Sequence, residues 1–380
     1  MKKILFTLLL LFPAFSKPAS NDFQQNTDYC RAKISDIVTE TKEENGMSTV
    51  ETTFFLDVKS GKAAGQKKTI VFKGQPDVPN YMKYRKGDTV FIGLNTITSA
   101  DSKDEYIAMY DIDNTNGIIA ILIIVALLLL AVGKLRGILS VVGLLITVLL
   151  IFFIFVPLTL KGFNPLVSGF FVAVASIFIT IPVITGLSLK TVNAIAGALS
   201  GIISAVALCS VIGIAMHLSG IVTDNLLTVF YVSDVNINLV HISLAGMILS
   251  ALGAVMDISI SISSAINEFF VVHPDVEFKT AFKSAMEVGR DNLGSMVNTL
   301  IMAYVGSSLS LVLVIYMKYD STMPLTMIFS HNEILAEILK SFAGCTGMLV
   351  AVPVTALAGV KLNMIRRRSV HNGFLNKKLD

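Results

Sequence analysis

The chain has 380 residues, of which 53% are hydrophobic and 15% are charged, and its formal net charge is +3. These values exclude a soluble domain with one large core, because the apolar residues gather in runs long enough to cross a bilayer. They also argue against nucleic acid as a partner, since no basic stretch interleaved with aromatic residues precedes the C-terminus.

Residues 1–16 have the pattern of a secretory signal peptide. Met1-Lys-Lys precedes a short apolar stretch, and Ala14-Phe-Ser16 supplies the small residues of a cleavage site. The apolar stretch is well short of the ~20 residues that a membrane helix needs. We therefore expect cleavage after Ser16, which would place the region that follows outside the cytoplasm.

Residues 17–115 are predicted to form a small extracytoplasmic β domain. Turn signals such as Ser60-Gly61 and Lys86-Gly-Asp88 separate its strand-like segments. About five short strands favour a small Greek-key barrel of the OB type. The sequence shows no basic aromatic face, so an oligonucleotide is not the expected ligand, and a docking role and a structural cap both stay open. The predicted strands are Tyr29–Thr39, Val50–Val58, Lys68–Lys73, Asp88–Leu94 and Glu105–Asp111.

Residues 116–365 are predicted to form a membrane α-helical bundle, and residues 366–380 a basic cytoplasmic tail. With the β domain outside, the connections on the side of the tail carry most of the lysine and arginine residues, as the positive-inside rule requires. A stripe of Asn193, Gly197, Ser200, Gly201 and Ser204 is attributed mainly to helix packing. The predicted spans number about seven, at 117–133, 137–157, 165–185, 192–217, 240–264, 292–317 and 337–360.

The predicted span 240–264 carries an acidic residue, Asp257, within an apolar run. Small and polar residues share its helix face, and Glu268 continues that face beyond the span. An ionised carboxylate facing lipid would cost several kcal/mol, so this face should meet other helices or water. Packing explains the glycine and serine residues but does not require an ionisable group. The face comprises Gly246, Ser250, Gly253, Asp257, Ser261 and Ser264.

The span that follows begins at Gly289-Arg-Asp-Asn. Asp291, Ser295 and Asn298 share one of its faces, and Gly294 lies beside them. Between the two spans, residues 278–288 have one apolar face, which favours an amphipathic helix lying at the membrane surface.

We expect no enzymatic activity. The sequence has no zinc-protease motif and no nucleotide-binding loop, and Ser200 and Asp257 have no evident catalytic partner. The three cysteines offer neither a disulfide framework nor a metal-ligand spacing, so no cofactor or metal is expected.

Several motifs resemble those of the YibE/YibF family. They are Tyr29-Cys-Arg-Ala-Lys33, Lys86-Gly-Asp-Thr-Val90, Tyr106…Tyr110-Asp111, and above all the stretches 253–263 and 289–300. The resemblance implies a multi-pass protein of the bacterial cell (inner or plasma) membrane. Residues 253–298 are also similar, more loosely, to the cores of SecD/SecF and RND-type transporters, which favours transport by analogy.

These patterns predict a transporter or export factor driven by an ion gradient, most simply of protons. Asp257 would take up and release the ion, with Ser261, Ser264 and Asn298 along its route. The gate, or an ion pair at the cytoplasmic end, would involve Glu268, Arg290, Asp291 and Ser295, and the helices would pack through Gly246, Gly253 and Gly294. The alternative is a membrane scaffold whose β domain recruits an envelope partner. The lipid bilayer is the expected partner, and an ion or small-molecule substrate, a homo-oligomer or a related membrane protein stay open.

Overall fold

The computed structural model describes residues 25–44, 47–74, 84–98, 103–218, 220, 226, 237–318, 326–327 and 332–376. The signal peptide predicted for residues 1–16 and the end of the basic tail lie outside these ranges. The chain divides into two compact units, 1–128 and 129–380, which are described separately. The boundary predicted between residues 115 and 116 stays a prediction.

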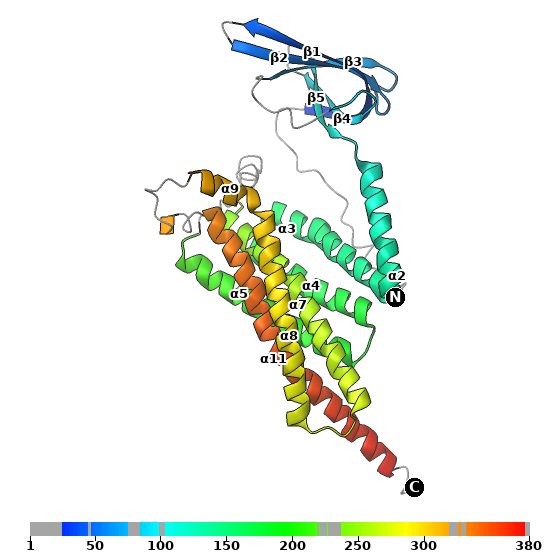
Figure 1. Cartoon of the computed structure of the whole chain (residues 1–380), viewed down its shortest axis with the longest axis vertical. Coiled ribbons are helices and arrows are strands. Elements are labelled where there is room, and N and C mark those ends of the chain that lie inside the picture. The colour runs from blue at the N-terminus through cyan, green and yellow to red at the C-terminus, as the bar shows by residue number, and fades with distance from the viewer. Residues whose placement is uncertain are drawn as a thin grey trace. The chain divides into compact units, whose positions relative to one another are not determined.

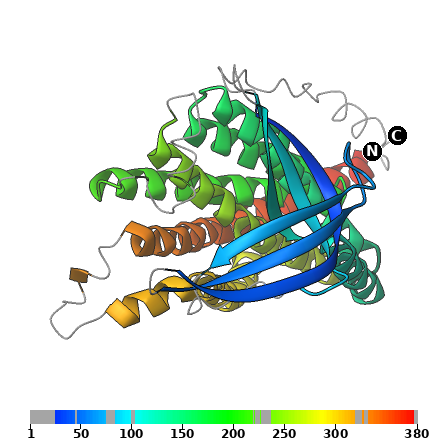
Figure 2. The same cartoon turned by 90° about the horizontal axis from the view of Figure 1, so that it is seen from above.

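The first unit contains a five-stranded antiparallel sheet in the order β3-β2-β1-β4-β5. All five predicted strands are confirmed, and each is longer than predicted. Figure 2 shows how strongly β1 and β2 curve, so that the sheet forms a half-barrel. Closure into an OB barrel stays a prediction. The strands are β1 (Gln25–Glu44), β2 (Met47–Val58), β3 (Lys67–Gly74), β4 (Thr89–Thr98) and β5 (Lys103–Ile112).

One face of the sheet forms a hydrophobic core. Alternate residues of each strand point to the same side, so Cys30 and Ala32 of β1 are buried with Val90 and Ile92 of β4. Gly61 closes the β2–β3 connection above Cys30. Its φ of +82° favours glycine, and a Cβ there would lie 2.3 Å from the Cys30 Sγ. The turn therefore packs directly on this core.

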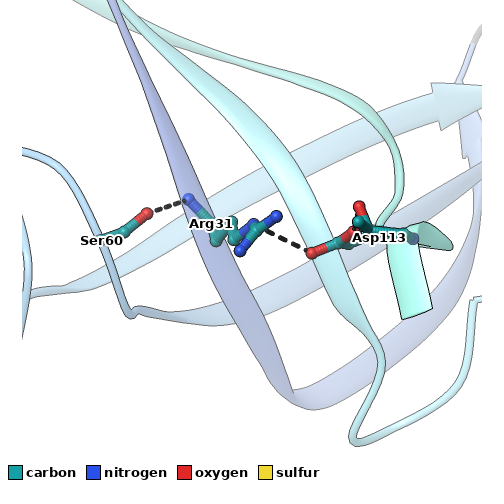
Figure 3. A network of polar contacts seen from close by, with 4 residues as sticks. Arg31, Ser60 and Asp113 are labelled. Atoms are coloured by element: carbon teal, nitrogen blue, oxygen red, sulfur yellow. Dashed lines mark hydrogen bonds and ion pairs between the residues drawn. The ribbon is translucent and has the colours of Figure 1, made fainter. Parts of the chain in front are cut away.

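A polar network joins the start of β1 to the end of β5 (Figure 3). The Arg31 Nε lies 3.0 Å from Asp113 Oδ2, and the Arg31 backbone N–H donates to Ser60 Oγ at 2.8 Å. Asp113 also accepts hydrogen bonds from the backbone N–H and the hydroxyl of Thr115. Asp113 therefore ties the sheet to the first residue of the helix that follows.

The stabilisation from Asp113 should be present at neutral pH and lost in acid. Hydrogen bonds from Thr115, together with the Arg31 charge, hold the pKa of Asp113 below its ordinary value. The carboxylate therefore stabilises the folded sheet above its unfolded pKa of about 3.9, and this contribution disappears as the pH falls through the lower folded value. Asp113→Asn should speed hydrogen exchange in β1 at pH 7, and the difference from the wild type should vanish in strong acid.

Asp36→Asn is the matched control, because its pair with Lys86 at 3.2 Å is exposed on both sides. Comparing each variant with the wild type at the same pH cancels the intrinsic exchange rate. Equal effects of the two substitutions at pH 7 would contradict the role given to Asp113.

The second unit and the helix leading into it contain six described helices long and apolar enough to cross a membrane. They lie in α2 (Thr115–Leu150), which continues through η1 (Ile151–Phe155) and α3 (Val156–Leu160), and in α4 (Pro165–Thr185), α5 (Leu189–Ala215), α7 (Leu239–Val272) and α11 (Asn332–Asn376). Figure 1 shows α11 side by side with α8 (Phe278–Ser307). The protein is therefore a multi-pass membrane protein.

The first two spans are two helices joined at a sharp break at Lys134 within α2. The Lys134 φ of 50° and ψ of −139° are not helical, and they divide α2 between the predicted spans 117–133 and 137–157. A Cβ at Gly137 would lie 2.4 Å from the Leu129 carbonyl oxygen, so only glycine fits this close approach.

The remaining predicted span, 292–317, coincides with the second half of α8 (Phe278–Ser307) and with α9 (Leu309–Lys318). These helices are not among the six, so a total of seven stays a prediction. The predicted surface helix 278–288 is instead the start of α8. Ala281 and Ala285 are buried, and Phe282 and Met286 pack against the bundle core. The apolar face therefore meets other helices.

The bundle core lies among α4, α5, α7 and α11. Glycines of α5 bring these helices close together, as the stripe on that helix predicted. A Cβ at Gly197 would lie 1.7 Å from Thr355 Oγ1 of α11. A Cβ at Gly201 would lie 2.5 Å from Val255 Cγ1 of α7 and 2.7 Å from the Gly347 carbonyl oxygen of α11. The α5 backbone therefore packs directly on both neighbours.

Candidate functional site

Helix α7 has two different sides. Its apolar side, including Leu252, Val255 and Ile262, is fully buried in the bundle core. The stripe that contains Asp257 lies on another side, and the Asp257 side chain is exposed in the single chain. It makes no hydrogen bond or ion pair with any residue that the structure describes. The acidic group therefore lies at the edge of the helix bundle rather than within its packed centre.

The stripe nevertheless contacts α8 at Ser261. The Asn292 Nδ2 donates to Ser261 Oγ at 3.0 Å. Residues 273–277 connect α7 to α8, so this contact joins two consecutive helices of the bundle.

For two antiparallel helices, counting four residues from this contact along each helix places Asp257 at the level of Met296. Asp257 is one turn from Ser261, on the same side of α7. Met296 is half-buried, and Ser264, on the other side of Ser261 toward the α7–α8 connection, is also half-buried. Asp257 therefore lies along the open margin between α7 and α8, one turn from a polar contact.

The polar residues predicted on α8 point elsewhere. Arg290, Asp291, Ser295 and Asn298 are all exposed, and the described residues give their side chains no hydrogen bond or ion pair with α7. Adjacent helical positions do not face each other, which explains why Arg290 and Asp291 do not pair. Glu268 is likewise exposed, near the end of α7. The structure thus brings Asp257 and Ser261 to the α8 margin, but not Asn298.

The three glycines predicted to promote helix packing face open space in the single chain. A Cβ at Gly246, Gly253 or Gly294 would meet no atom within 4 Å. All three are exposed, in contrast to Gly197 and Gly201 of α5. Packing at these three positions would require a second chain, and it stays a prediction.

A comparison with protein families assigns the sequence of this region to a known family. The model of the family described as YibE/F-like protein matches residues 121–364, which is more than half of the chain. The chain belongs to the YibE/F-like family. Comparison with curated proteins and with solved structures gave no match. The YibE/F-like region includes the membrane helices from α2 to α11 and leaves the β sheet outside it.

The YibE/F-like region also holds a buried polar set that the sequence analysis did not connect. Ser259 and Ser263 of α7 are fully buried, and their hydroxyls donate to the carbonyl oxygens of Val255 and Lys190. Thr355 and Asn193 are fully buried as well, and both amide atoms of Asn193 have no hydrogen-bond partner among the described residues. An unpaired buried amide is costly, and close packing of α5 does not require one.

A second charged group within the family region is paired. Lys340 and Glu337, one turn apart on α11, form an ion pair, and both side chains are about three-quarters buried. No group of three or more histidine, cysteine, aspartate or glutamate side chains that could hold a metal ion occurs within the described ranges. Asp257 is therefore distinguished from Glu337 by its lack of a described partner.

Cysteine cross-linking should verify the α7–α8 register. In a variant without Cys30, Cys209 and Cys345, the double substitution Ser261→Cys and Asn292→Cys should form a disulfide within one chain under mild oxidation. The two side chains touch at 3.0 Å in the structure. Mass spectrometry of the digested protein would identify the cross-linked peptide.

Ser261→Cys with Asn298→Cys is the control. Asn298 is exposed and lies six residues further along α8, which is about 9 Å along the helix axis. Equal cross-linking of the two pairs would show that α8 does not keep this register.

Proposed function

We propose that this YibE/F-like protein is a transporter or export factor driven by an ion gradient, with protons as the coupling ion. Asp257 takes up and releases the proton at the α7–α8 margin. Ser261 and Ser264 lie along the route, while Arg290 and Asp291 belong to the cytoplasmic end of α8. The observation that supports the proposal is an ionisable, unpaired side chain midway along a 34-residue apolar helix.

The exposure of Asp257 sharpens this proposal. An ionised carboxylate in contact with lipid costs several kcal/mol, so its exposed side requires water or another protein chain in the membrane. The margin is suited to water, because Ser261 and Asn292 form a polar contact one turn away. Polar groups that open to one side of a bundle are expected where ions enter or leave it.

The test is proton movement in sealed proteoliposomes that contain the pH dye pyranine. A potassium diffusion potential set with valinomycin drives protons inward, and the assay is repeated with monovalent and divalent cations inside. We expect faster acidification of the lumen than in protein-free liposomes under at least one condition. Identical rates under all conditions would contradict a proton-coupled transporter.

The second candidate function is a membrane scaffold, and the exposed tyrosines of the sheet favour it. Tyr29 of β1 and Tyr110 of β5 are large exposed side chains on one surface of the extracytoplasmic domain proposed here. Removal of residues 25–112 separates the two functions. A transporter should keep its proton flux without the sheet, whereas a scaffold should lose its partner and show no flux in either form.

A further inference from the structure

The outer face of the sheet carries three exposed tyrosines. Alternation along the strands places Tyr29 of β1 on the side opposite the buried Cys30, and Tyr106 and Tyr110 of β5 on that same side. Gly93 of β4 pairs with Tyr29 on one side and with Ala108 on the other. We call Tyr29, Gly93, Tyr106, Ala108 and Tyr110 the tyrosine face.

Small residues lie between the tyrosine rings on the surface of the sheet. Gly93 and Ala108 have little or no side chain, so the tyrosines flank a shallow strip across β4 and β5. Tyr29, Tyr106 and Tyr110 are 66%, 43% and 47% exposed. The Tyr29 and Tyr110 rings lie 5.7 Å apart between centroids. Rings that already contact each other lose little further freedom when a ligand binds.

None of the five residues of the tyrosine face is charged. Arg31, the next residue of β1 on this side after Tyr29, is paired with Asp113 and lies 5.5 Å from the Phe91 ring centroid. Figure 3 shows its guanidinium turned toward Asp113. Lys33, the next cation on this side, is exposed and lies four residues from Tyr29, or about 13 Å. Desolvation, followed by the interaction with Tyr29, raises the pKa of Tyr110, so its hydroxyl is neutral at physiological pH. The face therefore offers ring surfaces and uncharged hydroxyl groups.

We propose that the tyrosine face binds a neutral oligosaccharide built of pyranose rings. A pyranose has an apolar C–H surface that covers an aromatic ring, and hydroxyls at its edge that can hydrogen-bond to Tyr29 and Tyr110. Tyr106 and Tyr110 are four residues apart on β5, or about 13 Å, so the strip fits several linked sugars better than one.

Other ligands fit this face less well. A nucleic acid or an anionic polymer needs several unpaired cations, whereas the Arg31 charge is offset by Asp113 and Lys33 is a single exposed cation further along this side of β1. An amphipathic helix needs an apolar groove, whereas here the tyrosine hydroxyl groups would lose water without gaining hydrogen-bond partners. A sugar can both cover the rings and hydrogen-bond to the hydroxyl groups. An aromatic face was not predicted from the sequence, and the structure shows one on β1 and β5.

The test is binding of a labelled sugar to the full-length protein in phosphatidylcholine nanodiscs. Fluorescein-labelled hexasaccharides of N-acetylglucosamine and of glucose are titrated with protein, and fluorescence anisotropy reports binding. We expect saturable binding of at least one hexasaccharide, which the unlabelled sugar displaces. Tyr29→Ala and Tyr110→Ala should each weaken it about tenfold, as expected for loss of one stacking ring.

Phe55→Ala is the matched control, because Phe55 is also an exposed aromatic residue of this sheet but belongs to β2. It should bind as the wild type does. Tyr110→Phe keeps the ring and should weaken binding less than Tyr110→Ala. Hydrogen exchange of β1 verifies that each variant keeps its fold.

Four results would overturn the proposal. The first three are no binding of either hexasaccharide, equal binding by the wild type and by Tyr29→Ala and Tyr110→Ala, and a loss of binding in Phe55→Ala equal to that in the tyrosine variants. The fourth is contact of the rings with lipid. If brominated phosphatidylcholine quenches the tyrosine emission, and the quenching falls in a variant with both tyrosines replaced by alanine, the face lies on the membrane and does not bind sugar.

Discussion

Replacing Asp257 with asparagine should abolish gradient-driven proton flux and leave the protein folded. Asparagine has nearly the same shape as aspartate, but its amide group does not take up or release a proton at the pH values at which the protein functions. Asp257 makes no hydrogen bond or ion pair with the described residues, so the substitution breaks no contact that holds the bundle together. In the pyranine assay, the rate should fall to that of protein-free liposomes.

Glu337→Gln is the matched control for this experiment. Glu337 is also an acidic residue within a span, but it is paired with Lys340 and is not part of the proposed route. Its variant should keep most of the flux, although loss of the ion pair lowers its thermal stability. Asp257→Glu, which keeps the carboxyl group, should retain part of the flux that Asp257→Asn loses.

Carbodiimide labelling gives a measurement that does not depend on flux. Dicyclohexylcarbodiimide reacts with protonated carboxyl groups in apolar surroundings, so it should modify the α7 peptide of the wild type and not that of Asp257→Asn. Full flux in Asp257→Asn would end the proposal that this group carries the ion. Absence of labelling over the whole accessible range of pH would show that Asp257 does not become protonated in the membrane.

The positions of most strands and helices could be predicted from the sequence, but not which side of each helix is buried. Strand-like segments between turn signals predicted five strands, and apolar runs predicted the spans at residues 165–185 and 192–217 within a few positions of α4 and α5. Such patterns report local geometry, which the chain itself determines. The non-helical backbone at Lys134 falls in the connection predicted between the spans 117–133 and 137–157.

The orientation of α8 could not be predicted from its polar residues. Asp291, Ser295 and Asn298 were predicted to share one face, with Asn298 on the ion route, but Leu293 and Leu300 pack against the bundle and that face is exposed. Asn292, one position away, is the residue that meets Ser261. In a membrane helix, the packing of neighbouring helices decides which side faces inward, and polarity alone cannot distinguish water from a partner helix.

The glycines of this protein should separate into two classes when each is replaced by alanine. Gly201→Ala should destabilise the bundle by about 1–3 kcal/mol, because the added carbon overpacks a dense contact. It would lie 2.5 Å from Val255 Cγ1, 2.7 Å from the Gly347 carbonyl oxygen and 3.2 Å from Ala351 Cβ. A backbone carbonyl cannot move aside as the end of a flexible side chain can. The midpoint of thermal unfolding in detergent should therefore fall.

Gly253→Ala is the matched substitution on α7. Both positions are inside helices, so alanine gains the same helix propensity, about 0.5–1 kcal/mol, at each. No atom lies within 4 Å of a Cβ at Gly253, so in a single chain this variant should unfold at the wild-type temperature or slightly above it. Equal shifts for the two variants would contradict the packing of α5 against α7 and α11.

The same pair of variants tests whether the open stripe of α7 meets a second chain. If Gly253 packs against another copy in the membrane, alanine there should weaken the oligomer while leaving the unfolding of the single chain unchanged. Cross-linking in native membranes would then show less dimer for Gly253→Ala than for the wild type. Since an oligomer of this kind would also cover the exposed side of Asp257, its loss should reduce proton flux in the same variant. Unchanged cross-linking and flux would leave water as the medium that covers Asp257.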